Sequence, residues 1–229
     1  MFLHTTRSKA CAEKVVNVLW PFLNNARSFL DLGCGVGSWS AALEQKGINH
    51  FVMVDHPALQ KEALLVRQKD IFQPVNLDTD LPAPGRYDLA LCIEVLEHFT
   101  AERALEIFHF LSSQSDLVLF SAAVPGQHGK GHINCRRHAY WHQQFAAQGF
   151  DYYDGFKPQL FGMEDVHYWI QQNLFLYYRP SKANLFEGLQ NITHPDLELV
   201  HQHILQRKMG IWEYLKMAPK VFRKEQTWG

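Results

Sequence analysis

The sequence of 229 residues lacks any hydrophobic run long enough to cross a bilayer, and its first residues lack the layout of a signal peptide. It also lacks an excess of one charge, because 22 Lys and Arg stand against 23 Asp and Glu. No overall basic field would therefore draw it to nucleic acid or to an anionic membrane. We found no internal repeats or low-complexity runs. These absences favour a globular protein of the cytoplasm with no membrane partner.

Cysteine is scarce and scattered. The four residues lie at Cys11, Cys34, Cys92 and Cys135, and none forms a Cys-x-x-Cys pair. Such spacing offers no disulfide framework, so free thiols in a reducing compartment are expected. The length suits one domain with an appendage. We expect a catalytic domain over residues 1–180 and a C-terminal helical appendage over residues 181–229.

The most informative segment is Phe29-Leu-Asp-Leu-Gly-Cys-Gly-Val-Gly37. Two apolar residues lead to Asp31, three glycines follow at alternate positions, and helix-forming residues come next. This order predicts a buried strand, a tight turn and the start of a helix. Glycine has no Cβ, so such a turn lets a ligand approach the backbone closely.

Apolar patterning predicts alternating strands and helices over the first 150 residues, and therefore an α/β fold whose parallel sheet carries helices on both faces. Helices are expected at residues 8–23, 37–45, 101–111, 138–148 and 165–172, with a short one beginning at Pro57. Strands are expected at residues 28–31, 51–54, 64–66, 87–93, 117–120, 150–153 and 174–178. The last two strands could complete the sheet in an antiparallel manner. Weaker helical segments are expected at residues 197–208 and 211–216.

Acidic residues recur where these strands are expected to end, at Asp31, Asp55, Asp70 and Glu94. Ligands of open α/β sheets bind at the carboxyl ends of the strands. A dinucleotide site would instead show G-x-G-x-x-G, with a pyrophosphate at the helix start. Asp31 would repel a pyrophosphate there, whereas it suits the amino group and hydroxyls of S-adenosylmethionine (SAM).

The chain resembles the class I SAM-dependent methyltransferases. Residues Leu30–Gly37 are similar to the first motif of that family, Val52–Asp55 to its second and Tyr87–His98 to its fourth. The resemblance covers roughly the first two-thirds of the chain. It implies a Rossmann-like, doubly wound, seven-stranded sheet of order 3-2-1-4-5-7-6, in which strand seven is antiparallel.

The resemblance also implies roles for individual residues. Asp31 and Gly33 would face the methionine part of SAM, Asp55 the ribose and Asp70 the adenine, and S-adenosylhomocysteine would be the product. We expect Asp31→Ala to abolish SAM binding. The complete set of expected cofactor contacts is Asp31, Gly33, Cys34, Gly35, Gly37, Asp55, His56, Asp70, Ile71 and Glu94.

Two stretches could serve the reacting end. In the first, Glu94, Glu97 and His98 would share one face of a helix start. This string resembles small-RNA 2′-O-methyltransferases and ubiquinone-pathway O-methyltransferases, in which such residues bind a divalent metal with a later histidine, here His132. The same string is widespread in the superfamily without metal, where Glu97 and His98 would cap and orient the helix. We therefore expect no metal and keep these four residues as its only candidates.

The second stretch is the loop from Pro125 to Asn134, which follows an expected strand and is rich in glycine. Histidine near its ordinary pKa can remove the proton of a hydroxyl. His132 is therefore the first candidate for a catalytic base, with Glu94 and His98 beside it. The alternative is that His132 and Asn134 only pin the loop through hydrogen bonds.

Residues 121–134 and Trp169–Asn173 resemble a bacterial methyltransferase subgroup whose genes often accompany glycan-assembly or natural-product genes. The chain departs from that subgroup at His128-Gly129 and at Cys135-Arg136. Its acceptor is therefore expected to differ.

Taken together, these features predict SAM-dependent O-methylation of a small-molecule, sugar or natural-product acceptor. One alternative is a metal-assisted RNA 2′-O-methyltransferase, which the near-zero net charge disfavours. Another is a SAM-binding subunit without catalysis. The expected partners are a small-molecule or glycan acceptor and, as an open option, a second copy of the chain in a homodimer.

Overall fold

The computed structural model describes residues 2–127 and 129–192, and the side chains among them from residue 7 onward. Its α-helices are α1 (Phe2–Leu23), α2 (Ser38–Gln45), α3 (Ala101–Gln114), α4 (His138–Ala147), α5 (Lys157–Leu160) and α6 (Tyr168–Asn173). Its strands are β1 (Ser28–Leu32), β2 (His50–Asp55), β3 (Phe72–Pro74), β4 (Leu89–Ile93), β5 (Leu117–Ser121), β6 (Asp151–Tyr153) and β7 (Phe175–Tyr178). Short 3₁₀ turns are η1 (Lys61–Ala63), η2 (Leu96–His98) and η3 (Pro180–Phe186).

The strands form one seven-stranded sheet of order β3-β2-β1-β4-β5-β7-β6. The pairs from β3 to β5 are parallel, and β7 lies antiparallel to both β5 and β6. The expected order and the antiparallel seventh strand are confirmed. Because the first five strands are parallel, their carboxyl ends meet at one edge of the sheet.

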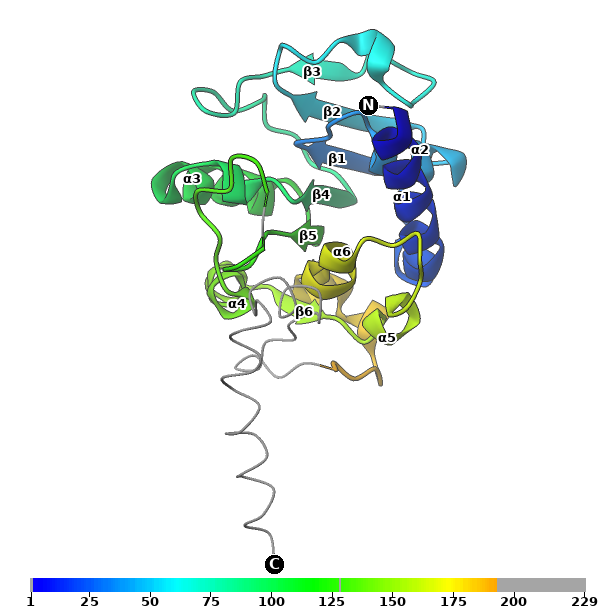
Figure 1. Cartoon of the computed structure of the whole chain (residues 1–229). Coiled ribbons are helices and arrows are strands. Elements are labelled where there is room, and N and C mark those ends of the chain that lie inside the picture. Colours follow the sequence, from blue (N-terminus) through cyan, green and yellow to red (C-terminus); the bar gives the residue numbers. More distant parts are fainter. Residues whose placement is uncertain (1, 128, 193–229) are drawn as a thin grey trace, which may run out of the picture.

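Helices cover both faces of the sheet (Figure 1). Helices α1 and α2 lie on one face with α5 and α6, where Leu19, Leu43 and Ile170 join one apolar cluster. Helices α3 and α4 lie on the other face, where Phe108 and Phe145 join a second cluster. Strands buried on both sides explain why the central segments read as continuous apolar runs.

The position of the third strand was predicted incorrectly. Leu64–Val66 is not a strand: Leu64 and Val66 are buried beside α2 as irregular chain, and β3 forms eight residues after Leu64, at Phe72–Pro74. A short apolar run fills a core equally well as an extended loop, so its composition alone does not identify a strand. Pro74 is tolerated because β3 is an edge strand, where one lost donor is harmless.

Smaller differences concern the ends of helices. The first helix begins at Phe2 rather than at residue 8, and no helix starts at Pro57, where a turn leads to η1. The sixth helix is shorter than expected, and the four-residue α5 was not predicted. The chain after Glu94 forms η2 instead of the start of an α-helix, which changes the arrangement of Glu94, Glu97 and His98.

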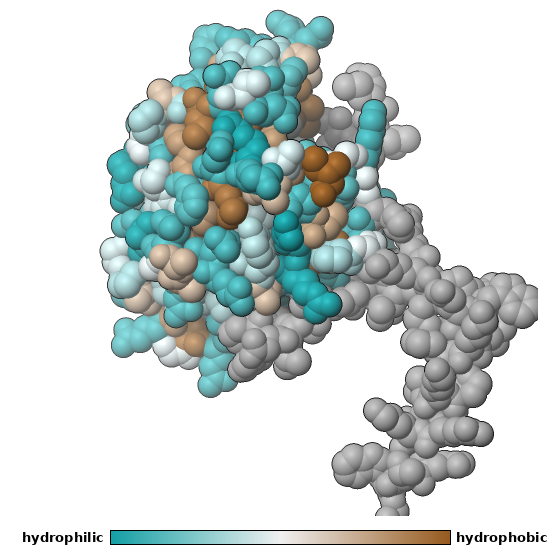
Figure 2. All heavy atoms as spheres, turned by 90° about the vertical axis from the view of Figure 1, so that its left-hand side faces the viewer, coloured by the Kyte–Doolittle hydropathy of each residue, from teal (hydrophilic) through white to brown (hydrophobic). Residues whose placement is uncertain are grey.

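Residues 180–192 pack against the sheet. Phe186 is buried and stacks on Tyr178, and Asn191 accepts a hydrogen bond from the backbone of Asp154. The rest of the expected appendage, including the helices expected at residues 197–208 and 211–216, lies outside the described residues. Among the described helices, none is long and apolar enough to cross a membrane. On the face shown in Figure 2, apolar residues form separate patches among hydrophilic ones.

Candidate cofactor and acceptor site

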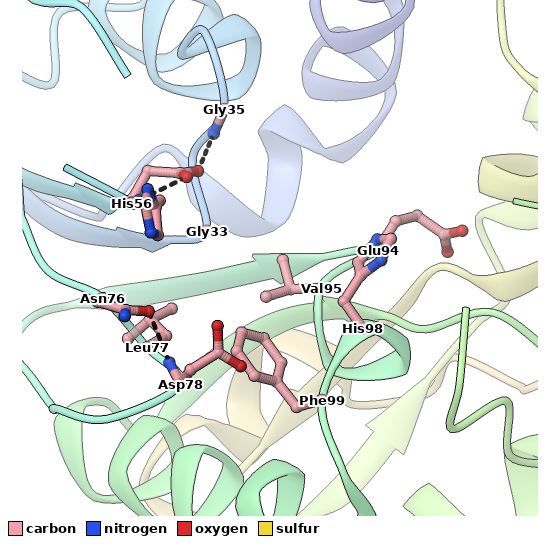
Figure 3. A pocket seen from close by; sticks show the side chains of 11 residues that line it. Gly33, Gly35, His56, Asn76, Leu77, Asp78, Glu94, Val95, His98 and Phe99 are labelled. Atoms are coloured by element: carbon pink, nitrogen blue, oxygen red, sulfur yellow. Dashed lines mark hydrogen bonds between the residues drawn. The ribbon is translucent and has the colours of Figure 1, made fainter. Parts of the chain in front are cut away.

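A cleft of about 320 Å³ opens at the carboxyl ends of β1, β2 and β4. Its walls come from the turns after these strands and from the loop after β3. The lining residues are Gly33, Gly35, Asp55, His56, Asn76, Leu77, Asp78, Glu94, Val95, His98 and Phe99. Five of the ten expected cofactor residues and the expected catalytic residue His98 thus meet in one place, as Figure 3 shows for most of the lining.

The glycine turn shapes one wall of the cleft. Gly33 has a φ of 78°, and a Cβ there would lie 2.5 Å from Val95 Cγ2, on the opposite wall. A side chain at Gly35, whose φ is 53°, would meet no atom within 4 Å. Both conformations favour glycine. Gly33 permits close packing of the two walls, and Gly35 leaves its backbone open to a ligand.

Asp55 at the end of β2 holds this turn. Its carboxylate accepts hydrogen bonds from the backbone N–H of Gly35 at 2.6 Å and of His56 at 2.7 Å. Each carboxylate oxygen has a further lone pair. Asp55 can therefore accept hydrogen bonds from two ligand hydroxyls while it fixes the turn, as expected of a residue that binds a ribose.

Asp31 does not line the cleft. It is 2 % exposed and accepts a hydrogen bond from the Ser40 hydroxyl of α2 at 2.5 Å. Burial raises the pKa of Asp31 from 3.8 to about 7. Cys34 is also buried, and Gly37 serves as the N-cap of α2 in a left-handed conformation. These three residues support the turn from behind instead of forming its surface.

The expected adenine contacts Asp70 and Ile71 lie before β3, at the amino end of that strand, and neither lines the cleft. They lie there because the third strand forms later in the chain than expected. The segment after β3 supplies Asn76, Leu77 and Asp78 instead. The Asn76 side chain accepts a hydrogen bond from the backbone N–H of Asp78 at 3.1 Å, which fixes this loop (Figure 3). The buried Phe72 was the sequence signal for the true strand.

Glu94 at the end of β4 has a φ of 56°, the one positive value of a described residue other than glycine. Such a conformation costs energy and persists only where the surroundings hold it. The backbone N–H of Glu94 donates to the carbonyl of Ser121 at 3.0 Å. Its carboxyl points away from the glycine turn (Figure 3) and accepts hydrogen bonds from Gln127 and from Asn173.

Glu97 is fully buried beneath the other side of the cleft. Among the described residues, neither carboxyl oxygen finds a hydrogen-bond partner of good geometry. Burial, and then the charge of Glu94, raise the pKa of Glu97 to about 9, although the backbone amides of Glu97 and Ala123 act in the opposite direction. Burial beside Glu94 therefore favours the neutral, protonated form of the Glu97 carboxyl.

His132 lies against this carboxyl and against His98. Its Nε2 is 3.9 Å from Glu97 Oε1, and the His98 and His132 rings meet edge to face with centroids 4.9 Å apart. Burial and the neighbouring His98 lower the pKa of His132, so its imidazole is neutral near pH 7. One ligand atom each from Glu97, His98 and His132 falls within 4.8 Å of the others, a spacing that could hold a metal ion. Glu94 does not join this group.

A family model described as a methyltransferase domain matches residues 2–156. This chain belongs to the methyltransferase-domain family. The resemblance to class I SAM-dependent methyltransferases is thereby confirmed, and SAM is the cofactor of these enzymes. The glycine turn, the carboxylate after β2 and the cleft between them lie where a cofactor binds in an open α/β sheet.

Comparison with individual proteins supports the same family. The magnesium-protoporphyrin O-methyltransferase of Synechocystis is 32 % identical over 99 residues, which are 42 % of this chain and 43 % of that protein. The match thus spans less than half of the relative. A structure of magnesium protoporphyrin IX methyltransferase from Synechocystis with bound S-adenosylhomocysteine has a TM-score of 0.53 at 20 % identity, covering 76 % of this chain and 84 % of the other.

A second fold neighbour is mitomycin 7-O-methyltransferase, with a TM-score of 0.52 at 14 % identity. The alignment covers 75 % of this chain and 54 % of that one. At such identities the likeness concerns the fold alone. The acceptor must be argued from the residues of the cleft, because one fold hosts many substrates.

Proposed function

We propose that this protein transfers the methyl group of SAM to an oxygen atom of a small-molecule, sugar or natural-product acceptor. The observation that carries the proposal is the position of His132: its ring contacts that of His98, which lines the cleft, and its Nε2 lies 3.9 Å from the buried Glu97 carboxyl. Burial also raises the pKa of Glu97 and lowers that of His132. A charged carboxylate at this place would favour the imidazolium form. The neutral one leaves His132 able to accept a proton.

The chemistry needs one base and one methyl donor. The acceptor oxygen attacks the methyl carbon in line with the sulfur, and the carbon–sulfur bond breaks with its electron pair passing to sulfur. The positive sulfonium thereby becomes the neutral thioether of S-adenosylhomocysteine. His132 takes the hydroxyl proton, which is the contribution expected of a general base near its working pH. The names of two similar proteins, both O-methyltransferases, agree with an oxygen acceptor.

The cofactor would lie along the cleft. Asp55 would accept the ribose hydroxyls, and the loop of Asn76, Leu77 and Asp78 would surround the adenine. The backbone of Gly33 and Gly35 would lie against the methionine part of SAM. The methyl group would then face His98 on the far wall.

A transfer assay with methyl-labelled SAM and a panel of phenols, sugars and hydroxylated small molecules tests this function. We expect His132→Ala to reduce turnover at least about a hundredfold, the usual contribution of a general base. The affinity for SAM should stay within twofold. The matched control is His50→Ala, which removes an exposed histidine at the amino end of β2, away from the cleft.

Full turnover in His132→Ala would dismiss its role as the base. Tight binding of SAM by the wild-type chain with no transfer to any acceptor would instead favour the alternative of a SAM-binding subunit without catalysis. Failure of the wild-type protein to bind SAM would contradict the assignment of SAM as the cofactor.

A second candidate is metal-assisted transfer, which the spacing of Glu97, His98 and His132 favours. The residues fit a divalent ion: the Glu97 oxygens lack hydrogen-bond partners among the described residues, and two imidazoles face them. A bound ion would polarise the acceptor oxygen as a Lewis acid. Glu97 would have to lose its proton to bind, so metal affinity would rise with pH.

Titration calorimetry with Mn²⁺ and Mg²⁺ on the wild type and on Glu97→Gln separates these mechanisms. A metal site predicts stoichiometric binding to the wild type and at least tenfold weaker binding to Glu97→Gln. Turnover that persists in EDTA would exclude the metal-assisted reaction. The RNA variant of this function further requires methylation of an RNA end, which the charge balance disfavours.

A further inference from the structure

A buried polar cluster joins three distant parts of the chain behind the cleft. Its centre is Asn173, 1 % exposed, at the end of α6 and outside the segment matched by the family model. The Asn173 Nδ2 donates to Glu94 Oε1 at 3.2 Å and to Gln127 Oε1 at 2.7 Å. Gln127 in turn donates to the other oxygen of Glu94. Glu94, Gln127 and Asn173 thus form a closed triangle of hydrogen bonds.

The orientation of the Asn173 amide is fixed from its other side. Its Oδ1 accepts from Gln172 Nε2 at 2.8 Å and lies 3.1 Å from His138 Nε2. Because that oxygen is an acceptor, the His138 ring must carry its proton on Nε2. With Gln172 donating to its oxygen, the Asn173 nitrogen faces the side-chain oxygens of Glu94 and Gln127.

Two members of the triangle, Glu94 and Gln127, connect it to the walls of the cleft. Glu94 carries the strained left-handed turn after β4, directly before Val95, which packs against Gly33. Gln127 belongs to the loop that continues to His132. A strained turn at a cavity wall persists only where contacts hold it. Ser121 accepts from the backbone N–H of Glu94, and the two amides donate to its carboxyl oxygens.

We propose that Asn173 is a positioning residue of the SAM cleft, which holds Glu94 in its left-handed conformation and, through Gln127, ties the His132 loop to the same wall. Asn173 reaches the cleft lining only through its hydrogen bond to the Glu94 carboxyl, and it makes no hydrogen bond to the candidate base. It acts through Glu94 and Gln127. This inference rests on the proposed function, because it takes the cleft to be the SAM site.

The first test is the affinity for SAM and for S-adenosylhomocysteine, measured by calorimetry on Asn173→Leu, which keeps the branched shape of the side chain but removes its amide. We expect affinity to fall about tenfold, equivalent to about 1.4 kcal/mol. The matched control is Gln171→Leu on the same helix. Gln171 is also buried, and it hydrogen-bonds Met163, Val166 and Gly162 instead of the cleft wall.

Gln171→Leu should lower the melting temperature but leave SAM affinity within twofold. A merely structural role of Asn173 would make the two variants alike in both measurements, and that result would overturn the proposal. Amide hydrogen exchange gives a readout without ligand: residues 126–127 and 129–137 should exchange faster in Asn173→Leu and not in Gln171→Leu.

The decisive test compares the effect of Asn173→Leu on SAM affinity in two proteins, the wild type and the Glu94→Gly variant. Glu94→Gly removes the cost of the positive φ, since glycine adopts it freely. In that background, Asn173→Leu should weaken SAM binding by less than twofold. An equal tenfold loss in both backgrounds would show that Asn173 does not act through Glu94.

Because Asn173 lies in the core, Gln127→Ala in the loop gives a second route to the same triangle if Asn173→Leu does not fold. It should weaken SAM binding in the wild-type background and not in Glu94→Gly. Failure of the wild type to bind SAM would refute the proposed function. Binding that is insensitive to both variants would refute only the positioning role.

Discussion

On the β1 to β3 side of the cleft, the backbone amides of Gly35 and His56 hold one carboxylate, whereas on the β4 to β7 side buried side chains hold one another. The residues of the first side are close in sequence to the ends of two strands: Gly35 follows β1, Asp55 ends β2 and His56 comes next. The second gathers Glu94 and Asn173, which are 79 residues apart. Both sides define the same cleft, but one is made of main chain and the other of side chains.

The difference bears on what each side can do. Backbone donors keep their geometry in any sequence that preserves the turn, so the first side suits a constant ligand such as the cofactor. Buried side chains can change their protonation, so the second side suits the proton transfer of the reaction. We therefore expect the loss of the Asp55 carboxylate on the first side to reduce SAM affinity most, and the loss of the His132 imidazole on the second side to act on turnover.

The largest effect should come from Asp55→Asn. The amide cannot accept from both Gly35 and His56 as the carboxylate does, and it offers the ribose fewer acceptors. Hydrogen bonds to charged groups contribute about 1.5–3 kcal/mol each, so SAM should bind about a hundredfold more weakly by calorimetry.

Asp88→Asn is the matched control for Asp55→Asn. Asp88 also accepts from two backbone amides, those of Arg27 at 2.8 Å and Ser28 at 3.0 Å, but it lies before β4, at the opposite edge of the sheet. It should lower stability and leave SAM affinity within twofold. Equal losses in both variants would mean that Asp55 acts only through folding, and the comparison of the two sides would fail.

The sequence predicted the first side well because its information is contiguous. The glycine turn from Gly33 to Gly37 and the carboxylate Asp55 could be identified from local order alone. The parallel core, the strand order and the antiparallel last strand followed from alternation and from the family resemblance. The alternation of elements depends on apolar residues and turns within a short window, whereas the strand order was implied by the resemblance.

The errors arose where tertiary packing overrode the local pattern. Leu64 and Val66 look like a strand but fill the core as a loop, and this misplaced the expected adenine contacts onto Asp70 and Ile71. The Glu94–Gln127–Asn173 triangle could not be predicted, since no local signal links the end of β4 to the end of α6. The left-handed turn at Glu94 likewise broke the helix expected to align it with Glu97.

An intermediate effect should distinguish the adenine wall proposed from the cleft from the one expected from the sequence. Asp78 lines the cleft, whereas Asp70 is exposed before β3. Loss of one charged acceptor should weaken SAM binding about tenfold in Asp78→Asn. Asp70→Asn is the control and should stay within twofold in the same calorimetric titration. The reverse ranking would restore the sequence-based assignment and refute the cleft as the adenine site.

The smallest effect on SAM affinity should come from Asp31→Asn, because Asp31 is a buried side chain behind the main-chain side of the cleft. Its contact is the Ser40 hydroxyl, and an amide oxygen can still accept that hydrogen bond. A direct contact with SAM would predict a large loss of binding, as the sequence predicts for Asp31→Ala. Burial predicts a change below threefold.

The same variant should change the pH dependence of stability. Burial raises the pKa of Asp31 from 3.8 to about 7, so the folded state holds this proton more tightly than the unfolded state. Its contribution to the free energy of unfolding is therefore full below pH 4 and is lost as pH rises through about 7. Urea unfolding between pH 4 and pH 8 should show this decline in the wild type and a flatter profile in Asp31→Asn. A profile unchanged by the substitution would mean that Asp31 is already ionised in the fold, and that a cation, the SAM ammonium included, could reach it.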